Sequence, residues 1–216
     1  MLTNGFHEVP TGKLAMVVTH LEMRTRADTR PVPTPDGIEL HPIENITVDE
    51  YRDLYRRVGE DWLWFSRLNM SEIELSKIID DPKVVLFTLM KNGVQHALLE
   101  LDFRTAGECE LAFFGLAKEL IGSGAGRYLM NHAIDVAWNH DITRFHVHTC
   151  TIDSPAALNF YIRSGFTAIG RQVEVADDPR VSNGWDTRIA THIPIIQPQS
   201  HLTSITDDQA SIINAV

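Results

Sequence analysis

The sequence has few cysteines and no metal-binding histidine pattern, and each of these absences excludes a class of protein. Its two cysteines, Cys109 and Cys150, do not form a CxxC pair. We therefore expect two reduced thiols in a cytoplasmic protein, with a disulfide as the alternative. The ten histidines contain no HxxxH or HExxH spacing, so we expect no metal cofactor.

Basic residues and long apolar runs are also scarce. The chain has 19 Lys and Arg against 29 Asp and Glu, a formal net charge of −10. Such a chain repels a phosphate backbone, so we expect no nucleic-acid partner. No apolar run approaches the roughly 20 residues of a membrane helix, and the start lacks the features of a secretory signal. We therefore expect no membrane partner and a soluble protein that handles small molecules.

The length of 216 residues, 44% of them hydrophobic, suits one core. Residues 1–36 contain one expected strand, Lys13–Met23, and a proline-rich segment, which together form an N-terminal arm. Regular patterning begins at Gly37, so we expect a single domain over residues 37–197. The polar segment 198–216 is expected to be a mobile tail.

Local signals predict two helices and then an antiparallel meander. Thr47 with Glu50, and Ser71 with Glu74, form capping boxes, and the second helix should end at Ile79, before Asp-Pro. Alternation predicts a strand over 37–43 and three more over 84–90, 94–103 and 109–116, with a hairpin turn at 91–93.

The second half predicts a strand–helix–strand–helix unit. A helix follows the glycine-rich stretch, a strand covers 144–152, and Ser154-Pro155 caps a helix that ends at Gly165. Two late strands are expected over 166–175 and 187–196. The fold class is therefore α/β, with a mixed, mostly antiparallel sheet flanked by helices.

The stretch IGSGAGRYL places glycines at Gly122, Gly124 and Gly126 before a helix. Unpaired backbone N–H groups at a helix start bind anions, and Arg127 would add charge. Close packing of the helix on the sheet explains the glycines equally well. A Walker A loop is excluded, since Arg127-Tyr128 stand where Lys-Ser/Thr is required, and the spacing is wrong for a GxGxxG dinucleotide fingerprint.

The segment from Glu110 to Phe166 resembles the core of the GCN5-related N-acetyltransferase (GNAT) superfamily. The family loop Gln/Arg-x-x-Gly-x-Gly/Ala is met at Gly124 and Gly126, whereas Ile121 departs from it. The second family pattern matches SPAALNFYIRSGF at four positions, and Ser154 replaces the usual Asn. The matching positions are Ala157, Tyr161, Gly165 and Phe166.

The resemblance implies the GNAT (acyl-CoA N-acyltransferase) fold and an acetyl-CoA-dependent enzyme. It would transfer acetyl to a primary amine of a small molecule or a peptide or protein. Backbone N–H groups of the loop would hold the pyrophosphate, and the strand at 109–116 would carry the pantetheine and acetyl contacts. The implied acetyl-CoA residues are Gly122, Ser123, Gly124, Ala125, Gly126 and Arg127 in the loop, and Phe114, Gly115 and Leu116 in the strand.

Within that strand, two features bear on catalysis. The Leu116 N–H would face the thioester carbonyl and stabilise the developing oxyanion. Gly115 fits a bulge that opens the sheet, with a packing glycine as the alternative. Regular alternation would place Glu110, Ala112 and Phe114 on one face.

Tyr161 and Glu110 are the expected catalytic residues. The family often places a proton donor at the Tyr161 position, and a phenol can protonate a thiolate while staying neutral at pH 7; simple packing of Tyr161 is compatible with this. Glu110 lies fourteen positions before Gly124, where histone acetyltransferase relatives carry their base. Glu100 or a water relay is the alternative.

His146 and His148 share one face of the next strand, and we expect structural histidines there in preference to a base. The acceptor pocket is expected near GEDWLWFSRL, where aromatic rings adjoin carboxylates, unless the tryptophans belong to the core. The residues weakly assigned to the substrate are Glu60, Asp61, Trp62 and Trp64. A homodimer is possible.

Two other functions compete with an acetyltransferase. A catalytically silent acyl-CoA-binding sensor would share the loop but not depend on Glu110 or Tyr161. A nucleotide-binding enzyme would use the loop for ATP or NAD.

Overall fold

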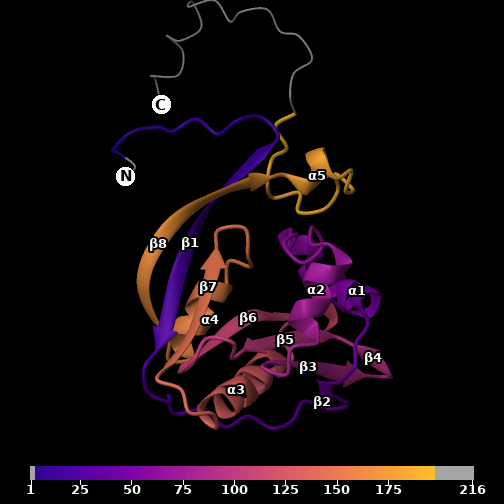
Figure 1. The fold of residues 1–216 in the computed structure, drawn as a ribbon, viewed down its shortest axis with the longest axis vertical. Helices are drawn as coiled ribbons and strands as arrows, with labels where there is room; N and C mark the ends of the chain where they lie inside the picture. Colours follow the sequence, from indigo (N-terminus) through magenta and orange to yellow (C-terminus); the bar gives the residue numbers. More distant parts are fainter. Residues whose placement is uncertain (1–2, 198–216) are drawn as a thin grey trace, which may run out of the picture.

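One mixed β-sheet runs through the part of the chain that this computed structural model describes, residues 3–197 (Figure 1). Its strands are β1 (Lys13–Met23), β2 (Glu39–Ile43), β3 (Val84–Lys91), β4 (Val94–Gln95), β5 (Ala97–Asp102), β6 (Glu108–Leu116), β7 (Arg144–Cys150) and β8 (Thr167–Asp177). The helices are α1 (Val48–Gly59), α2 (Glu72–Ile79), α3 (Ala125–Trp138), α4 (Ala157–Arg163) and α5 (Pro179–Ser182), with 3-10 turns at Glu60–Trp62 and Lys118–Leu120.

The sheet order is β2-β3-β5-β6-β7-β1-β8, and β4 pairs with β3. β6 and β7 are parallel and are joined by the crossover helix α3, whereas the other neighbours are antiparallel. The expected mixed, mostly antiparallel sheet is confirmed.

Helices cover both faces of the sheet (Figure 1). α3 and α4 pack on one face in a core that includes Leu99 and Leu101 of β5. α1 and α2 pack on the other face around Leu98 of the same strand. This alternation along β5 follows from the period of two in a strand, so every β5 residue is buried.

Both capping boxes form as expected. The Thr47 hydroxyl accepts the Glu50 N–H at 3.3 Å, and the Glu50 carboxylate accepts the Thr47 N–H at 2.9 Å. Ser71 and Glu74 repeat the arrangement at the start of α2. Each capping box joins residues only three positions apart, so it can be recognised from the local sequence.

The sheet opens between β6 and β7. The two strands pair only where Glu108–Glu110 meets Arg144–His146. The described part of the chain shows no β6–β7 pairing beyond these residues, so the later half of β6 has a free edge toward β7. The two strands therefore splay apart beyond this short pairing.

β1 lies inside the sheet, paired with β7 on one side and β8 on the other. The strand of the N-terminal arm therefore belongs to the same sheet as the strands of residues 37–197. β8 forms the outer edge, and its side chains are exposed along almost the whole strand.

The prediction of a strand over 187–196 is wrong. These residues form turns after α5, a helix that the sequence pattern did not reveal. The buried Arg180 guanidinium donates to the carbonyl oxygens of Ile189, Ala190 and Ile193 at 3.0–3.1 Å and pairs with Asp178. In a strand, these carbonyl oxygens would accept hydrogen bonds from a neighbouring strand. Here they accept hydrogen bonds from the Arg180 side chain instead.

The prediction of a bulge at Gly115 is also wrong. The register between β5 and β6 shifts at Ala112, because Glu100 pairs with Phe113 whereas Leu101 pairs with Leu111. The extra residue reverses the alternation, so Phe114 packs with Leu111 on the α3 side. The shared face predicted for Glu110, Ala112 and Phe114 is therefore wrong.

Two smaller boundaries differ from expectation. The strand expected over 94–103 is interrupted at His96. α4 begins at Ala157 with Ala156 as its N-cap, although Ser154 Oγ accepts the Ala156 N–H at 3.4 Å in the preceding turn. The tail expected over 198–216 lies outside the described residues. In residues 3–197, no helix has the length and apolar character needed to span a bilayer.

Candidate functional site

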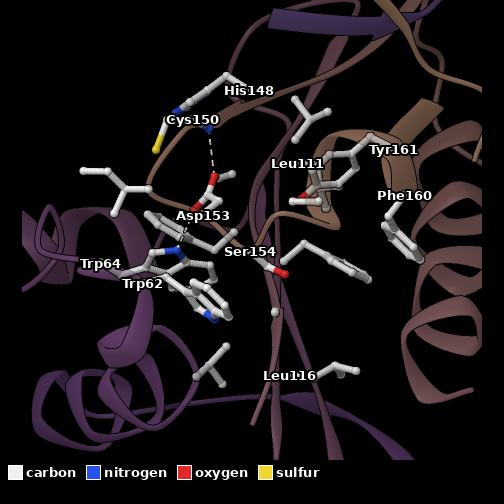
Figure 2. A pocket seen from close by; sticks show the side chains of 18 of the residues that line it. Trp62, Trp64, Leu111, Leu116, His148, Cys150, Asp153, Ser154, Phe160 and Tyr161 are labelled. Atoms are coloured by element: carbon white, nitrogen blue, oxygen red, sulfur yellow. Dashed lines mark hydrogen bonds between the residues drawn. The ribbon is translucent and has the colours of Figure 1, made fainter. Parts of the chain in front are cut away.

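A cavity of about 850 Å³ occupies the opening between β6 and β7. It extends from the start of α3 and from α4 to the segment after α1. Figure 2 shows Phe160 and Tyr161 on one side of this cavity and Trp62 and Trp64 on the other, with Asp153 and Ser154 between them.

The cavity brings together most of the residues expected at a site. Its wall includes Glu110, Phe114, Gly115, Leu116, Gly122, Gly124, Gly126, Arg127, Tyr161, Trp62 and Trp64. Four expected residues lie outside the wall: Ser123, Ala125, Glu60 and Asp61. Ser123 hydrogen-bonds within its own loop, Ala125 is fully buried, and Asp61 pairs with Lys118 at 3.2 Å.

The glycine loop presents unpaired backbone donors at the start of α3. Gly122 and Gly124 have φ values of 83° and 87°, a conformation that favours glycine. Within residues 3–197, the N–H groups of Gly122, Gly124, Gly126 and Arg127 have no backbone acceptor. The loop therefore offers several N–H groups beside the positive end of the α3 dipole.

Positive side chains adjoin this loop. Arg127 donates to Ser164 Oγ at 2.9 Å, and its guanidinium lies 5.0 Å from the centre of the Phe160 ring. Burial, and then repulsion from Arg30 and Arg163, lowers the pKa of Arg127. Arg163 also lines the cavity, so an anion bound here would relieve the repulsion between these cations.

The free edge of β6 exposes two further donors. The Ala117 N–H donates to His96 O at 2.8 Å, on the β5 side. Since N–H groups alternate in direction along a strand, those of Gly115 and Phe113 also face β5. The N–H groups of Phe114 and Leu116 therefore face the opening.

Glu110 lies at the inner end of this opening. It sits opposite Asp102 of β5 and His146 of β7. Its Oε1 is 3.6 Å from Nδ1 of His148. The interaction with His148 lowers the pKa of Glu110 despite partial burial, so the carboxylate is ionised at neutral pH.

Glu100, the alternative base, is placed elsewhere. Its side chain is fully buried and does not line the cavity. It accepts a hydrogen bond from Tyr51 Oη at 2.5 Å and pairs with Arg67 Nη2 at 2.5 Å. These partners satisfy the Glu100 carboxylate, so of the two candidate carboxylates only Glu110 borders the cavity.

Tyr161 lines the cavity with a side chain that is almost fully buried. Its ring lies edge-on to Phe114, Phe160 and Phe166. Burial raises the pKa of the phenol well above its usual value. The hydroxyl therefore stays protonated at neutral pH.

Trp64 fits between two glycines. A Cβ on Gly59 would lie 2.3 Å from the Trp64 ring, and one on Gly115 would lie 2.9 Å from it and 2.4 Å from Val58. The ring also packs against Tyr55 and Phe113. Trp64 therefore packs against a core cluster and also lines the cavity.

Asp153 is a site residue that sequence reasoning missed. Its carboxylate accepts a hydrogen bond from Thr149 Oγ1 at 2.7 Å. It also accepts hydrogen bonds from the Cys150 N–H at 2.9 Å and Trp64 Nε1 at 3.2 Å (Figure 2). The Trp64 contact spans 89 positions, so no local signal could have revealed it.

The two cysteines are free, as expected. Cys150 lines the cavity, and burial raises the pKa of its thiol to about 11, so it is a poor nucleophile at neutral pH. Among residues 3–197, no group of three or more His, Cys, Asp or Glu side chains is arranged to hold a metal ion.

Comparison with known proteins places these features in a family. A model described as "Acetyltransferase (GNAT) family" matches residues 43–166. No curated protein matches the chain.

Solved structures share the fold at low identity. A GCN5-related N-acetyltransferase from Sphaerobacter thermophilus is 14% identical, with a TM-score of 0.57 over 76% of this chain and 52% of that one. A tandem GNAT protein from the clavulanic acid biosynthesis pathway is 14% identical, with a TM-score of 0.56 over 79% and 54%. An aminoglycoside acetyltransferase from an uncultured soil sample is 14% identical, with a TM-score of 0.51 over 64% and 94%. The chain spans about half the length of the first two.

Proposed function

Because the chain belongs to the acetyltransferase (GNAT) family, we propose that it transfers an acetyl group from acetyl-CoA to a primary amine. One observation carries the proposal: a single cavity joins unpaired loop N–H groups at one end to an ionised carboxylate and a protonated phenol at the other. These are the groups that direct acyl transfer from a thioester requires.

The loop is the proposed pyrophosphate site. The N–H groups of Gly122, Gly124, Gly126 and Arg127 supply donors, and the Arg127 and Arg163 side chains supply charge. Ile121 does not weaken this proposal, because backbone donors do not depend on the side chain that precedes them. Ser123 and Ala125 would contribute only through their backbone.

The free edge of β6 is the proposed pantetheine site. An extended amide chain can add to an unpaired strand edge as another strand would. The inferred directions of the Phe114 and Leu116 N–H groups support this placement. Gly115 contributes by admitting Trp64 beside the strand.

Acetyl-CoA supplies an activated acetyl thioester. Glu110 accepts the proton that the attacking amine must lose, and the Leu116 N–H stabilises charge on the carbonyl oxygen. The Tyr161 hydroxyl donates a proton to the leaving thiolate and regains one from the second N–H bond that the amine loses. Burial raises the pKa of Tyr161, so the phenol still carries its proton at neutral pH when the thiolate forms. No metal is required for these steps.

The acceptor amine enters on the side of Trp62 and Trp64. Asp153, Glu110 and Glu174 also line the cavity and would attract a cationic amine. Glu60 and Asp61 lie outside the cavity wall and have no part in this proposal. The acceptor is a small molecule or an exposed peptide amine.

A panel of amines tests the proposal by following free thiol release from acetyl-CoA. We expect Glu110→Gln and Tyr161→Phe to lower kcat by about 100-fold or more, since general acid–base catalysis contributes about 10²–10⁴. If wild type binds acetyl-CoA but neither variant alters turnover of its best amine, the catalytic assignment is wrong. If wild type binds acetyl-CoA and no amine reacts, the silent sensor is the better description.

We extend the proposal to a homodimer formed through β8. This strand is the sheet edge, and Ile169, Val173 and Val175 on it are each about half exposed. A second copy would cover an edge that otherwise promotes uncontrolled pairing. Sedimentation velocity should show a dimer for wild type and a monomer for Val173→Lys; a monomeric wild type would refute it.

A further inference from the structure

Glu110 has a neighbour that connects it to a second hollow. This hollow, of about 550 Å³, is formed by β1, β7 and β8 and is lined by Val18, His20, His148, Gln172, Val173 and Glu174. His148 and Glu174 also line the main cavity. His148 therefore lies at the boundary between the two spaces, and Figure 2 shows it at the end of the cavity beyond Cys150.

The orientation of His148 suits proton exchange on both sides. Its Nδ1 is 3.6 Å from Glu110 Oε1, and half of its side chain is exposed. Its ring centre lies 5.9 Å from that of His20, and His20 Nε2 contacts Gln172 Oε1 at 2.8 Å. The imidazole thus touches the proposed base on one side and a solvent-accessible polar hollow on the other.

We propose that His148 relays the proton accepted by Glu110 to solvent in the second hollow. The relay deepens the proposed acetyltransferase and rests on that function. His148 acts through Glu110 and does not touch the amine, so it is a positioning and relay residue.

The proton balance is as follows for each turnover. Of the two N–H protons that the acceptor ammonium loses, one replaces on Tyr161 the proton that the phenol gives to the leaving thiolate, and the other passes to the Glu110–His148 pair. The proton resides on the imidazole, which becomes an imidazolium beside the Glu110 carboxylate. The imidazolium then loses one proton to water in the second hollow, and the pair returns to its starting state for the next amine.

Charged groups from every neighbouring element act on His148. Glu110 of β6 raises its pKa most, and Asp153 of the loop after β7 and Glu174 of β8 raise it further, while burial opposes them. His20 of β1 and His146 of β7 are the other titratable neighbours. The pKa of His148 is raised above the value of an ordinary histidine, and the pKa of Glu110 is lowered below that of an ordinary glutamate. A proton shared by the two groups therefore resides on the imidazole.

The sign of the pH dependence follows from this. His148 accepts a proton only when it is neutral, which requires a pH above its pKa. Turnover should therefore rise with pH through that pKa, at a value above that of an ordinary histidine.

His146 provides a matched control on the same strand. It lies two positions earlier on the same face, and its Nε2 is 3.5 Å from Glu108. It lines neither hollow, and burial lowers its pKa. A His146→Gln substitution therefore removes a strand imidazole that also neighbours Glu110 but does not lie between the two hollows.

The test compares kcat/KM against pH for wild type, His148→Gln and His146→Gln in the full chain. We expect His148→Gln to lower kcat/KM at neutral pH by about tenfold to 100-fold and to lose the rising limb, a loss within the range of proton-transfer catalysis. His146→Gln should keep the rising limb, displaced along the pH axis because the substitution also changes the charge beside Glu110. Added imidazole should restore turnover to His148→Ala in proportion to its concentration.

Calorimetry with acetyl-CoA separates the relay from the proposed function. Each variant should bind acetyl-CoA as wild type does, since none lies in the loop or on β6. If wild type binds acetyl-CoA and acetylates an amine while His148→Gln keeps the same profile, the relay alone is wrong. Equal losses in His148→Gln and His146→Gln, without imidazole rescue, would also overturn it. If wild type acetylates no amine, the proposed function fails and the relay fails with it.

Discussion

The Trp64 indole N–H donates a hydrogen bond to Asp153 Oδ1 at 3.2 Å and so joins the segment after α1 to the loop after β7. The two residues are 89 positions apart, and the bond crosses the side of the opening at which the amine is proposed to enter. Trp64 reaches Asp153 only because Gly59 and Gly115 leave room for its ring. The width of the cavity therefore depends on two glycines that carry no functional group.

Gly115→Ala should disturb this arrangement. The new Cβ would lie 2.4 Å from Val58 Cγ1 and 2.9 Å from the Trp64 ring, so both must shift. We expect a loss of about 1–3 kcal/mol in the free energy of unfolding, as for other overpacked cores. Urea denaturation measures it. Gly170→Ala is the control, because a Cβ there meets nothing within 4 Å; equal effects of the two would contradict the packing role of Gly115.

Arg67→Met should destabilise the chain by about 3–5 kcal/mol, because it leaves the fully buried Glu100 carboxylate without its cation. Adding Glu100→Gln should recover most of the loss, since the amide oxygen still accepts the Tyr51 hydroxyl and carries no charge. Thermal or urea denaturation of both variants checks this. No recovery in the double variant would mean that packing of Arg67, and not its charge, is what matters.

Gly124→Ala should weaken acetyl-CoA binding. The residue has a φ of 87° at the N-cap of α3, so an alanine costs about 1–2 kcal/mol in strain or forces the loop to move. Gly93→Ala is matched in strain, with a φ of 75° in a hairpin turn outside the cavity. Both should lower Tm, and only Gly124→Ala should raise the Kd for acetyl-CoA. If the two variants had a similar Kd for acetyl-CoA, the glycine loop would not be part of the acetyl-CoA site.

Much of the fold could be predicted because its signals are local. Thr47 and Ser71 cap helices through residues three positions away, and the glycine loop opens α3 as expected. The strand–helix–strand pattern of the second half predicted the crossover through α3, and the family resemblance supplied the cavity residues of the glycine loop, β6 and α4.

Tertiary contacts explain what the sequence did not show. The shift at Ala112 arises from pairing with β5, and the turns at 187–196 arise because Arg180 binds their carbonyl groups. Asp153 and His148 acquire their surroundings from Trp64, Glu110 and His20, which come from other elements. None of these contacts leaves a periodic pattern in the chain.

The pH dependence of Tyr161 has a defined sign. Burial raises the pKa of the folded phenol above about 10, its usual value, so Tyr161 stays protonated through the range in which the protein is assayed. The folded state holds this proton more tightly than the unfolded state, so its contribution to stability is complete below about pH 10 and falls above it. An alkaline loss of kcat near pH 8–9 that disappears in Tyr161→Phe would contradict this.

The central claim is that the cavity between β6 and β7 binds acetyl-CoA through the loop from Gly122 to Arg127. Isothermal titration calorimetry of the full chain with acetyl-CoA, ATP and NAD tests it most directly. We predict saturable one-site binding of acetyl-CoA with a Kd of about micromolar order, near −8 kcal/mol, and no binding of ATP or NAD at the same concentration. Absence of a heat signal with acetyl-CoA, or preferential binding of ATP or NAD, would contradict the claim.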